Sequence, residues 1–179
     1  MIKPRSRMKN DTVYHITFSC YHRYWLFKSP HLYELLLERI ETVRIKYGFK
    51  VYAYVVMPNH VHLILNIEHS IIGKVLSSIK RPFSFHALKY LRDKFPDLHQ
   101  ELYFEYGSRK GYRFWQAGGG SINEIRTDIQ LTKTLEYVHS NPVKRELAKH
   151  PGEWSWSSYK FWEKGENRIL NVEKPEFLR

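Results

Sequence analysis

Residues 50–67, KVYAYVVMPNHVHLILNI, decide the fold of this chain. Two runs of aromatic, β-branched and aliphatic residues, 50–56 and 60–67, flank the short break Met57-Pro58-Asn59. Such residues favour β-strands, and a break this short favours a hairpin-like connection. The stretch therefore predicts two adjacent antiparallel strands.

Upstream of this pair, the sequence predicts one strand and one helix. Residues 12–19 (TVYHITFS) mix β-branched and aromatic types, as strands do. In residues 31–48, apolar side chains recur at spacings of three and four from Leu36 to Tyr47. This pattern forms one face of an amphipathic helix, which Gly48 closes.

Downstream, the sequence predicts a basic helical region at 70–94, which Pro82 kinks or divides. Residues 112–116 (YRFWQ) have the composition of a fourth strand, and the loop AGGGS follows them. Two capping-box patterns lie at 121–124 and 127–130, and the second predicts a helix from about residue 128.

That last helix is expected to bury Leu131, Leu135 and Val138. Asn141-Pro142 is expected to interrupt it, because a residue before proline resists the α conformation. A short helical piece then continues to about residue 149.

This element order predicts an α+β, ferredoxin-like two-layer sandwich, with a mainly antiparallel sheet and helices on one face. We expect a single domain over residues 1–179, with its core at about 12–162. A basic N-terminal arm precedes the core, and an aromatic and then polar tail ends the chain.

Composition narrows the function classes. The formal net charge is +11, which favours a polyanionic partner such as nucleic acid. The one cysteine, Cys20, excludes a disulfide framework and a cysteine-rich zinc site. We expect no membrane span, no secretory signal and a cytoplasmic location, because the apolar runs are short and the basic N-terminus has no apolar region behind it.

His60 and His62 form the sharpest local motif. Side chains two apart on a strand lie on the same face, so both imidazoles are expected on one side, with Val61 and Leu63 on the other. Two neighbouring imidazoles are half of a site for a divalent cation. The alternative is a pair of partly exposed histidines with no ligand.

Tyr137 and Asn141 form the second motif, four residues apart on the predicted helix and on one face of it. This face is rotated away from the buried residues, so the Tyr137 hydroxyl could meet a ligand. Two structural alternatives stay open: Asn141 is a good N-cap before Pro142, and Tyr137 simply packs.

Together these segments resemble a known family. MPNHVHLIL resembles the histidine–hydrophobic–histidine signature of the HUH single-strand nucleases, and YVHSNPVKREL resembles the nucleophile helix of their single-tyrosine insertion-sequence transposases. Phe114-Trp115-Gln116 with its glycine loop, and Trp154 to Tyr159, resemble further blocks of the group. The nearest branch is that of the REP-associated tyrosine transposases, over about residues 12–162.

The resemblance implies a metal-dependent endonuclease and strand transferase acting on single-stranded DNA with hairpin or palindromic sequences. Tyr137 would be the nucleophile, forming a 5′-phosphotyrosine. His60 and His62 would hold Mg²⁺ or Mn²⁺, whereas ligand chemistry alone would rank Mn²⁺ or Zn²⁺ equally. Asn141 stands where classical members carry a glutamine ligand, and its side chain is one methylene shorter.

Such an enzyme must grip DNA phosphates and bases. No Walker-type loop is present, so we expect no nucleotide cofactor. Trp154, Trp156 and Trp162 either stack on bases or close the edge of the core. The cations expected to contact DNA, each alternatively part of a solvated surface, are Arg5, Arg7, Lys80, Arg81, Arg109, Lys110, Arg113, Lys144 and Arg145.

Two other functions compete with this one. A catalytically silent module of the same fold would bind DNA or RNA hairpins regardless of metal. A metal-dependent hydrolase that uses water would leave no covalent adduct. The sequence does not determine the oligomeric state. Insertion-sequence relatives are dimers that share active sites, whereas a monomer is an open alternative for REP-associated members.

Overall fold

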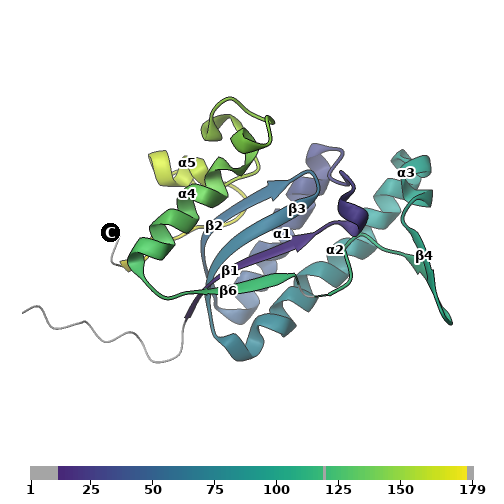
Figure 1. Cartoon of the computed structure of the whole chain (residues 1–179), viewed down its shortest axis with the longest axis horizontal. Helices are drawn as coiled ribbons and strands as arrows, with labels where there is room; N and C mark the ends of the chain where they lie inside the picture. Colours follow the sequence, from purple (N-terminus) through teal and green to yellow (C-terminus); the bar gives the residue numbers. More distant parts are fainter. Residues whose placement is uncertain (1–11, 119, 177–179) are drawn as a thin grey trace, which may run out of the picture.

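A four-stranded antiparallel sheet forms the centre of the molecule in a computed structural model that describes residues 12–118 and 120–176 (Figure 1). Its strands are β1 (Thr12–Ser19), β2 (Lys50–Met57), β3 (His60–Ile67) and β6 (Ser121–Ile125). They lie in the order β2-β3-β1-β6, and every neighbouring pair is antiparallel. The three strands predicted around residues 12–67 are thus confirmed.

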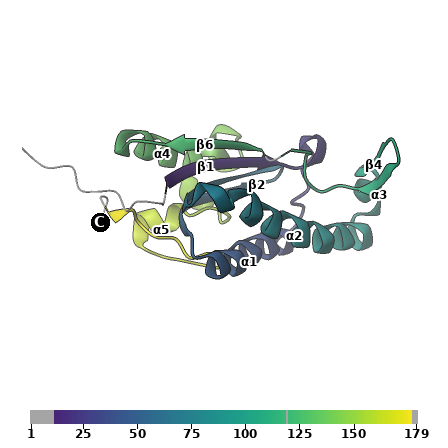
Figure 2. The same cartoon turned by 90° about the horizontal axis from the view of Figure 1, so that it is seen from below.

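Helices cover both faces of this sheet. α1 (Pro30–Tyr47) and α2 (Ile72–Lys94) lie on one face, while α4 (Asp128–Lys144) lies across the other (Figure 2). The α+β ferredoxin-like class is confirmed, and α4 is an addition to the expected single layer of helices. No helix in the described ranges is long and apolar enough to cross a membrane.

Smaller elements complete the chain. Strands β4 and β5 pair with each other in a separate hairpin, which projects from the end of α2 (Figure 1). The remaining elements are the 3-10 helices η1 (Tyr21–Arg23), η2 (His69–Ile71) and η3 (Pro151–Glu153), the helices α3 (Pro96–Gln100) and α5 (Tyr159–Lys164), and the strands β4 (Tyr103–Tyr106) and β5 (Arg109–Tyr112).

Alternation along β3 divides the core into two parts. Val61, Leu63 and Leu65 pack into the large core beneath α1 and α2, whereas Ile64 belongs to the smaller core beneath α4. Because side chains alternate across a strand, His60 and His62 share the α4 face with Ile64. The predicted separation of the imidazoles from Val61 and Leu63 is therefore confirmed.

The predicted fourth strand at 112–116 is wrong. Tyr112 ends β5, and Trp115 makes only an isolated bridge to Cys20. Phe114 and Trp115 are both buried, although they are consecutive, so they serve packing rather than strand alternation. The fourth strand of the sheet is β6, which occupies residues 121–125. The prediction that residues 121–124 cap a helix is therefore also wrong. β6 was missed because four of its five residues are exposed, so its apolar pattern is weak.

Gly120 explains how β6 reaches the sheet. Its φ of +85° is a left-handed conformation, and a Cβ added there would lie 1.9 Å from the Thr17 carbonyl oxygen. Only glycine permits both the conformation and this close approach. The next residue, Ser121, then pairs with Thr17.

The predicted interruption at Asn141-Pro142 is also wrong, because α4 runs through both residues to Lys144. Pro142 has no N–H for the Val138 carbonyl. The side-chain amide of Asn141 lies 3.4 Å from that oxygen and donates to the Tyr137 carbonyl at 2.8 Å. These bonds partly replace the missing backbone bond, and they exclude Asn141 as the N-cap of a new helix.

The C-terminal aromatic segment closes the edge of the core. The indole N–H groups of Trp154 and Trp162 donate to the carbonyls of Val56 and Tyr52, at 3.0 and 2.9 Å. Trp156 stacks on Tyr33 with 4.6 Å between ring centroids. Of the two roles considered for these tryptophans, the structure therefore favours packing.

Ser158 joins this segment to the sheet and to α4. Its hydroxyl is 2.9 Å from the Tyr54 backbone nitrogen and 2.8 Å from Nε2 of His139, and all three residues are buried. The link fixes the distance between α4 and β2. It also gives His139 a structural role.

We predict that Ser158→Ala lowers the free energy of unfolding by about 2 kcal/mol, because buried polar groups left without partners cost about 1–3 kcal/mol each. Urea denaturation followed by circular dichroism measures the change. Ser155→Ala, at an exposed position in the same segment, is the control and should shift stability by no more than about 0.5 kcal/mol. Equal stability of the two variants would contradict the structural link.

Candidate functional site

His60 and His62 lie at the start of β3, where three strands meet. His62 is opposite Thr17 of β1 and Val55 of β2, and His60 is opposite Ser19 and Met57. Only 8% of His60 and 4% of His62 is exposed. The strand pairing thus places both rings on a polar patch beside α4.

Burial holds both imidazoles in the neutral form. It lowers the pKa of His60 to about 4, with smaller contributions from the positive charges of Arg23 and Arg145. It lowers the pKa of His62 to about 3, with smaller contributions from His60 and His15. A neutral imidazole is the form that binds metal ions.

His62 has one nitrogen in hydrogen bonds and one without a partner. Its Nδ1 lies 3.0 Å from Nε2 of His15 and 3.1 Å from the Thr17 hydroxyl. Its Nε2 is buried and has no hydrogen-bond partner among the described residues. A proton on Nδ1, donated to His15 or Thr17, would leave the Nε2 lone pair free for a cation.

His15 and Thr17 are site residues that the sequence analysis missed. Both belong to β1, and the His15 ring stacks on His62 with 5.2 Å between centroids. The available signal was their spacing of two within TVYHITFS, which puts them on one strand face. Nothing in the sequence indicated that this face would meet His62.

Asn59 orients His60 in a similar way. Its side-chain oxygen lies 2.6 Å from His60 Nδ1, and its amide nitrogen donates to the Arg23 carbonyl at 3.3 Å. Asn59 therefore connects the imidazole to the turn that follows β1. The sequence analysis had read this residue only as part of a strand connection.

Tyr137 of α4 stands over the imidazoles within the same chain. Its ring is edge-on to His62 and His15, with centroid distances of 5.7 and 6.1 Å. The ammonium group of Lys144 lies 5.0 Å from the Tyr137 ring centroid. The side chain is 45% exposed, which confirms that it lies off the buried stripe of α4.

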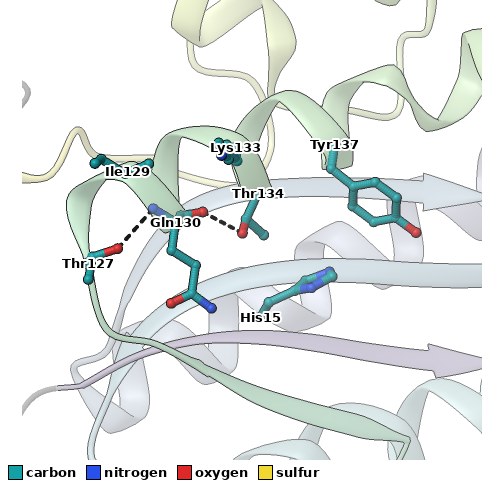
Figure 3. Close-up of a pocket in the computed structure, with 7 residues that line it drawn as sticks. All are labelled: His15, Thr127, Ile129, Gln130, Lys133, Thr134 and Tyr137. Atoms are coloured by element: carbon teal, nitrogen blue, oxygen red, sulfur yellow. Dashed lines mark hydrogen bonds between the residues drawn. The ribbon is translucent and has the colours of Figure 1, made fainter.

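A cavity of about 420 Å³ opens between the first half of α4 and β1, with Tyr137 and His15 at one end (Figure 3). In this view, Tyr137 points from the helix toward the sheet. The other lining residues are Thr127, Ile129, Gln130, Lys133 and Thr134. The Tyr137 side chain thus borders an open pocket and is reachable from solvent.

The end of α4 brings one positive charge toward His60. Arg145 lies close enough to lower the pKa of that imidazole. Asn141 is buried on the preceding turn, and its amide nitrogen is already committed to backbone carbonyls. Its side-chain oxygen has no hydrogen bond among the described residues, so it remains available as a ligand.

The donor set fits a divalent cation in part. The described residues contain no cluster of three or more His, Cys, Asp or Glu side chains that could hold a metal ion. The unpartnered Nε2 of His62 and the neutral state of both imidazoles match what a cation needs. A cation held by the two imidazoles would therefore need its further ligands from amide or hydroxyl oxygens, from a bound substrate or from water.

The predicted DNA-binding cations are dispersed. Lys144 and Arg145 lie beside the site, whereas Lys80 packs over Phe18 and Trp115 on the α2 side. Arg81 is exposed on α2, Arg109 and Lys110 are exposed on β5, and Arg113 stacks on Phe104. Arg5 and Arg7 lie outside the described residues.

The histidine pair on a central strand and the tyrosine on the facing helix are the two motifs on which the resemblance to single-tyrosine transposases rests. Residues 8–141 match the family described as IS200-like transposases. The match covers most of the chain, so the chain belongs to this family. The resemblance predicted from MPNHVHLIL and YVHSNPVKREL is confirmed.

Two similar proteins carry the name of the branch that the sequence resembles. A Haemophilus influenzae protein named as a candidate REP-associated tyrosine transposase is 26% identical over 115 residues, which are 63% of this chain and 60% of the relative. This chain thus spans about 60% of that curated relative. A solved structure of a REP-associated tyrosine transposase bound to a REP hairpin has a TM-score of 0.66 at 21% identity, covering 97% of this chain and 93% of the other, which confirms the fold.

The buried histidines predict that the metal-free protein loses stability in acid. The pKa of His139 is lowered by burial to about 4, below its ordinary value of 6.5, as happens for His60 and His62. Between about pH 6.5 and 4, these histidines bind protons in the unfolded chain but stay neutral in the folded chain. The free energy of unfolding should therefore fall as pH falls through this window, by about 1.4 kcal/mol per pH unit for each such histidine.

Urea unfolding in EDTA at a series of pH values measures this dependence. His139→Gln should flatten the slope by the contribution of one proton. His86→Gln, exposed on α2, controls for the substitution itself. An unchanged slope in His139→Gln would contradict the burial of that ring in its neutral form.

Proposed function

We propose that this chain is a metal-dependent single-stranded DNA endonuclease and strand transferase, acting near hairpin or palindromic sequences through a 5′-phosphotyrosine. The observation that carries the proposal is the edge-on position of Tyr137 at 5.7 Å from His62, between ring centroids. Membership of the IS200-like transposases supports the reaction type. The relative bound to a REP hairpin supports hairpin DNA as the substrate.

In the proposed reaction, the Tyr137 hydroxyl oxygen attacks the phosphorus of a DNA phosphodiester. The new bond joins the tyrosine oxygen to phosphorus, and the bond from phosphorus to the 3′ oxygen breaks. The phenol gives up a proton, and the departing 3′ oxygen takes one up. One phosphodiester replaces another, so the step is reversible without ATP and the 3′ hydroxyl, or another, can attack in turn.

His60 and His62 would hold Mg²⁺ or Mn²⁺ through imidazole nitrogen, with the Asn141 amide oxygen as a further ligand. A cation bound there would neutralise the negative charge that develops on the phosphoryl oxygens. Lys144 and Arg145 extend the positive field along the last turn of α4, where they would draw the DNA backbone toward Tyr137. The cavity beside Tyr137 leaves room for the strand that is cut.

The decisive experiment follows covalent adduct formation. With Mn²⁺ and a single-stranded oligonucleotide carrying the host's palindromic repeat, the protein should form an adduct that survives denaturant and runs slowly in a gel. Tyr137→Phe should form none, because it lacks the attacking oxygen, and EDTA should also abolish the adduct. Tyr106→Phe is the control, since this tyrosine is 81% exposed on the β4–β5 hairpin.

Adduct formation by Tyr137→Phe at the parent level would contradict the assigned nucleophile. Tight hairpin binding without any adduct, indifferent to EDTA, would instead favour the silent binding module. Cleavage without an adduct would favour hydrolysis by water. Each outcome therefore points to a different one of the three functions considered.

A second prediction concerns the number of chains in one site. Tyr137 meets the imidazoles within one chain, so each chain would carry a complete site. Mixing Tyr137→Phe with His62→Ala should therefore restore no adduct, because each chain lacks one essential group. Recovery toward about a quarter of the parent yield would instead mean that two chains exchange their α4 helices, because half of randomly mixed dimers would be mixed and each would hold one intact site out of two. Both variants are compared with the parent protein at equal total concentration.

A further inference from the structure

The turn that follows β1 exposes an unusual amount of aromatic surface. Residues 22–25 are exposed, including 36% of Tyr24 and 54% of Trp25. The flanking residues Cys20 and Leu26 are fully buried, so both ends of the turn are anchored in the core. The aromatic side chains between them are therefore presented to solvent by a firmly held segment.

The backbone of this turn is strained. His22 and Arg23 have φ values of 49° and 56°, which side chains with a Cβ rarely adopt. Gln116 accepts a hydrogen bond from the His22 amide at 3.2 Å, and the Arg23 amide donates to the Cys20 carbonyl at 3.0 Å. Strain maintained by specific bonds in this way is typical of functional positions.

Several rings of this turn lie close to one another. The Tyr21 and His22 rings lie 4.0 Å apart between centroids, and those of His22 and Tyr24 lie 5.7 Å apart. Trp25 follows directly in the chain. Aromatic side chains with exposed faces are what single-stranded nucleic acids use for base stacking.

The turn also adjoins the candidate site. Ser19 pairs with His60, and the Cys20 amide donates to the Asn59 carbonyl at 2.8 Å. The Asn59 side chain bonds to both His60 and the Arg23 carbonyl. The Arg23 charge therefore acts on the His60 imidazole from the turn at the end of β1 (Figure 1 shows this turn).

We propose that Tyr24 and Trp25 form a stacking platform for DNA bases beside the scissile phosphate, and that Arg23 contacts a neighbouring phosphate. This inference rests on the proposed function and adds the subsite that holds the strand next to the point of cleavage. The charge complements a phosphate, and the exposed rings complement unpaired bases. By contrast, the three C-terminal tryptophans are engaged in the core.

The test uses the full chain carrying Tyr137→Phe, so that binding is measured without cleavage. Its ligands are oligothymidylate and an abasic oligonucleotide of the same length, which keeps the phosphates and lacks the bases. Oligothymidylate should bind more tightly and quench the fluorescence of Trp25. Adding Trp25→Leu should weaken oligothymidylate binding about tenfold, equivalent to ~1.4 kcal/mol, and leave abasic binding unchanged.

Two further variants separate stacking from folding. Trp25→Phe keeps an aromatic face and should retain most of the affinity while losing the quenching. Phe85→Leu removes a side chain that is 70% exposed on α2 and should change neither ligand's affinity. Thermal melting checks that each variant is folded. Equal affinity of Trp25→Leu and its parent for oligothymidylate would overturn the stacking platform.

Arg23→Gln tests the phosphate contact. It should lower the affinity for oligothymidylate and for the abasic oligonucleotide by the same factor. It should also reduce the slope of log affinity against log salt concentration by about 0.7, the value for one phosphate of a single strand. Lys164→Ala removes a charge from α5 and should leave the slope unchanged. An unchanged slope in Arg23→Gln would overturn the proposed contact between Arg23 and a phosphate. Failure of adduct formation by Tyr137 would leave these binding results unaffected, so the two proposals fail separately.

Discussion

The antiparallel pairing of β1 with β3 is the constraint on which the site depends. Its register sets Thr17 opposite His62 and Ser19 opposite His60. One face of the same two strands supplies the large core through residues such as Ile16 and Leu63, while the other supplies the polar groups. A register shift of one residue would send the imidazoles into the apolar core, so the packing that stabilises the fold also keeps the site intact.

Burial and positive charge act together on these imidazoles. Low exposure disfavours their protonated forms, and Arg23 and Arg145 disfavour protonation of His60 further. In the proposed function, the same two positive charges would also attract the phosphates of DNA. One arrangement of charges would then both keep His60 neutral for a cation and draw the substrate toward the site.

Some features of α4 follow from its local sequence, and others depend on contacts with distant parts of the chain. Its start near residue 128 and its buried stripe follow from local signals, and both were predicted correctly. Its passage through Pro142 was not, because the Asn141 side chain replaces part of the lost backbone bonding. Its position across the sheet depends on contacts distant in the chain, such as the bond between His139 and Ser158.

By itself, the sequence determined the first three strands, the main helices, the shared face of His60 and His62, and the family, because alternation, helical spacing and short motifs are local properties. Only the tertiary structure decided that β6 completes the sheet, that His15 and Thr17 meet His62, and that the Tyr137 ring lies edge-on to His15 and His62. Those contacts join residues far apart in the chain. They arise from strand register and helix packing, which no single stretch of sequence encodes.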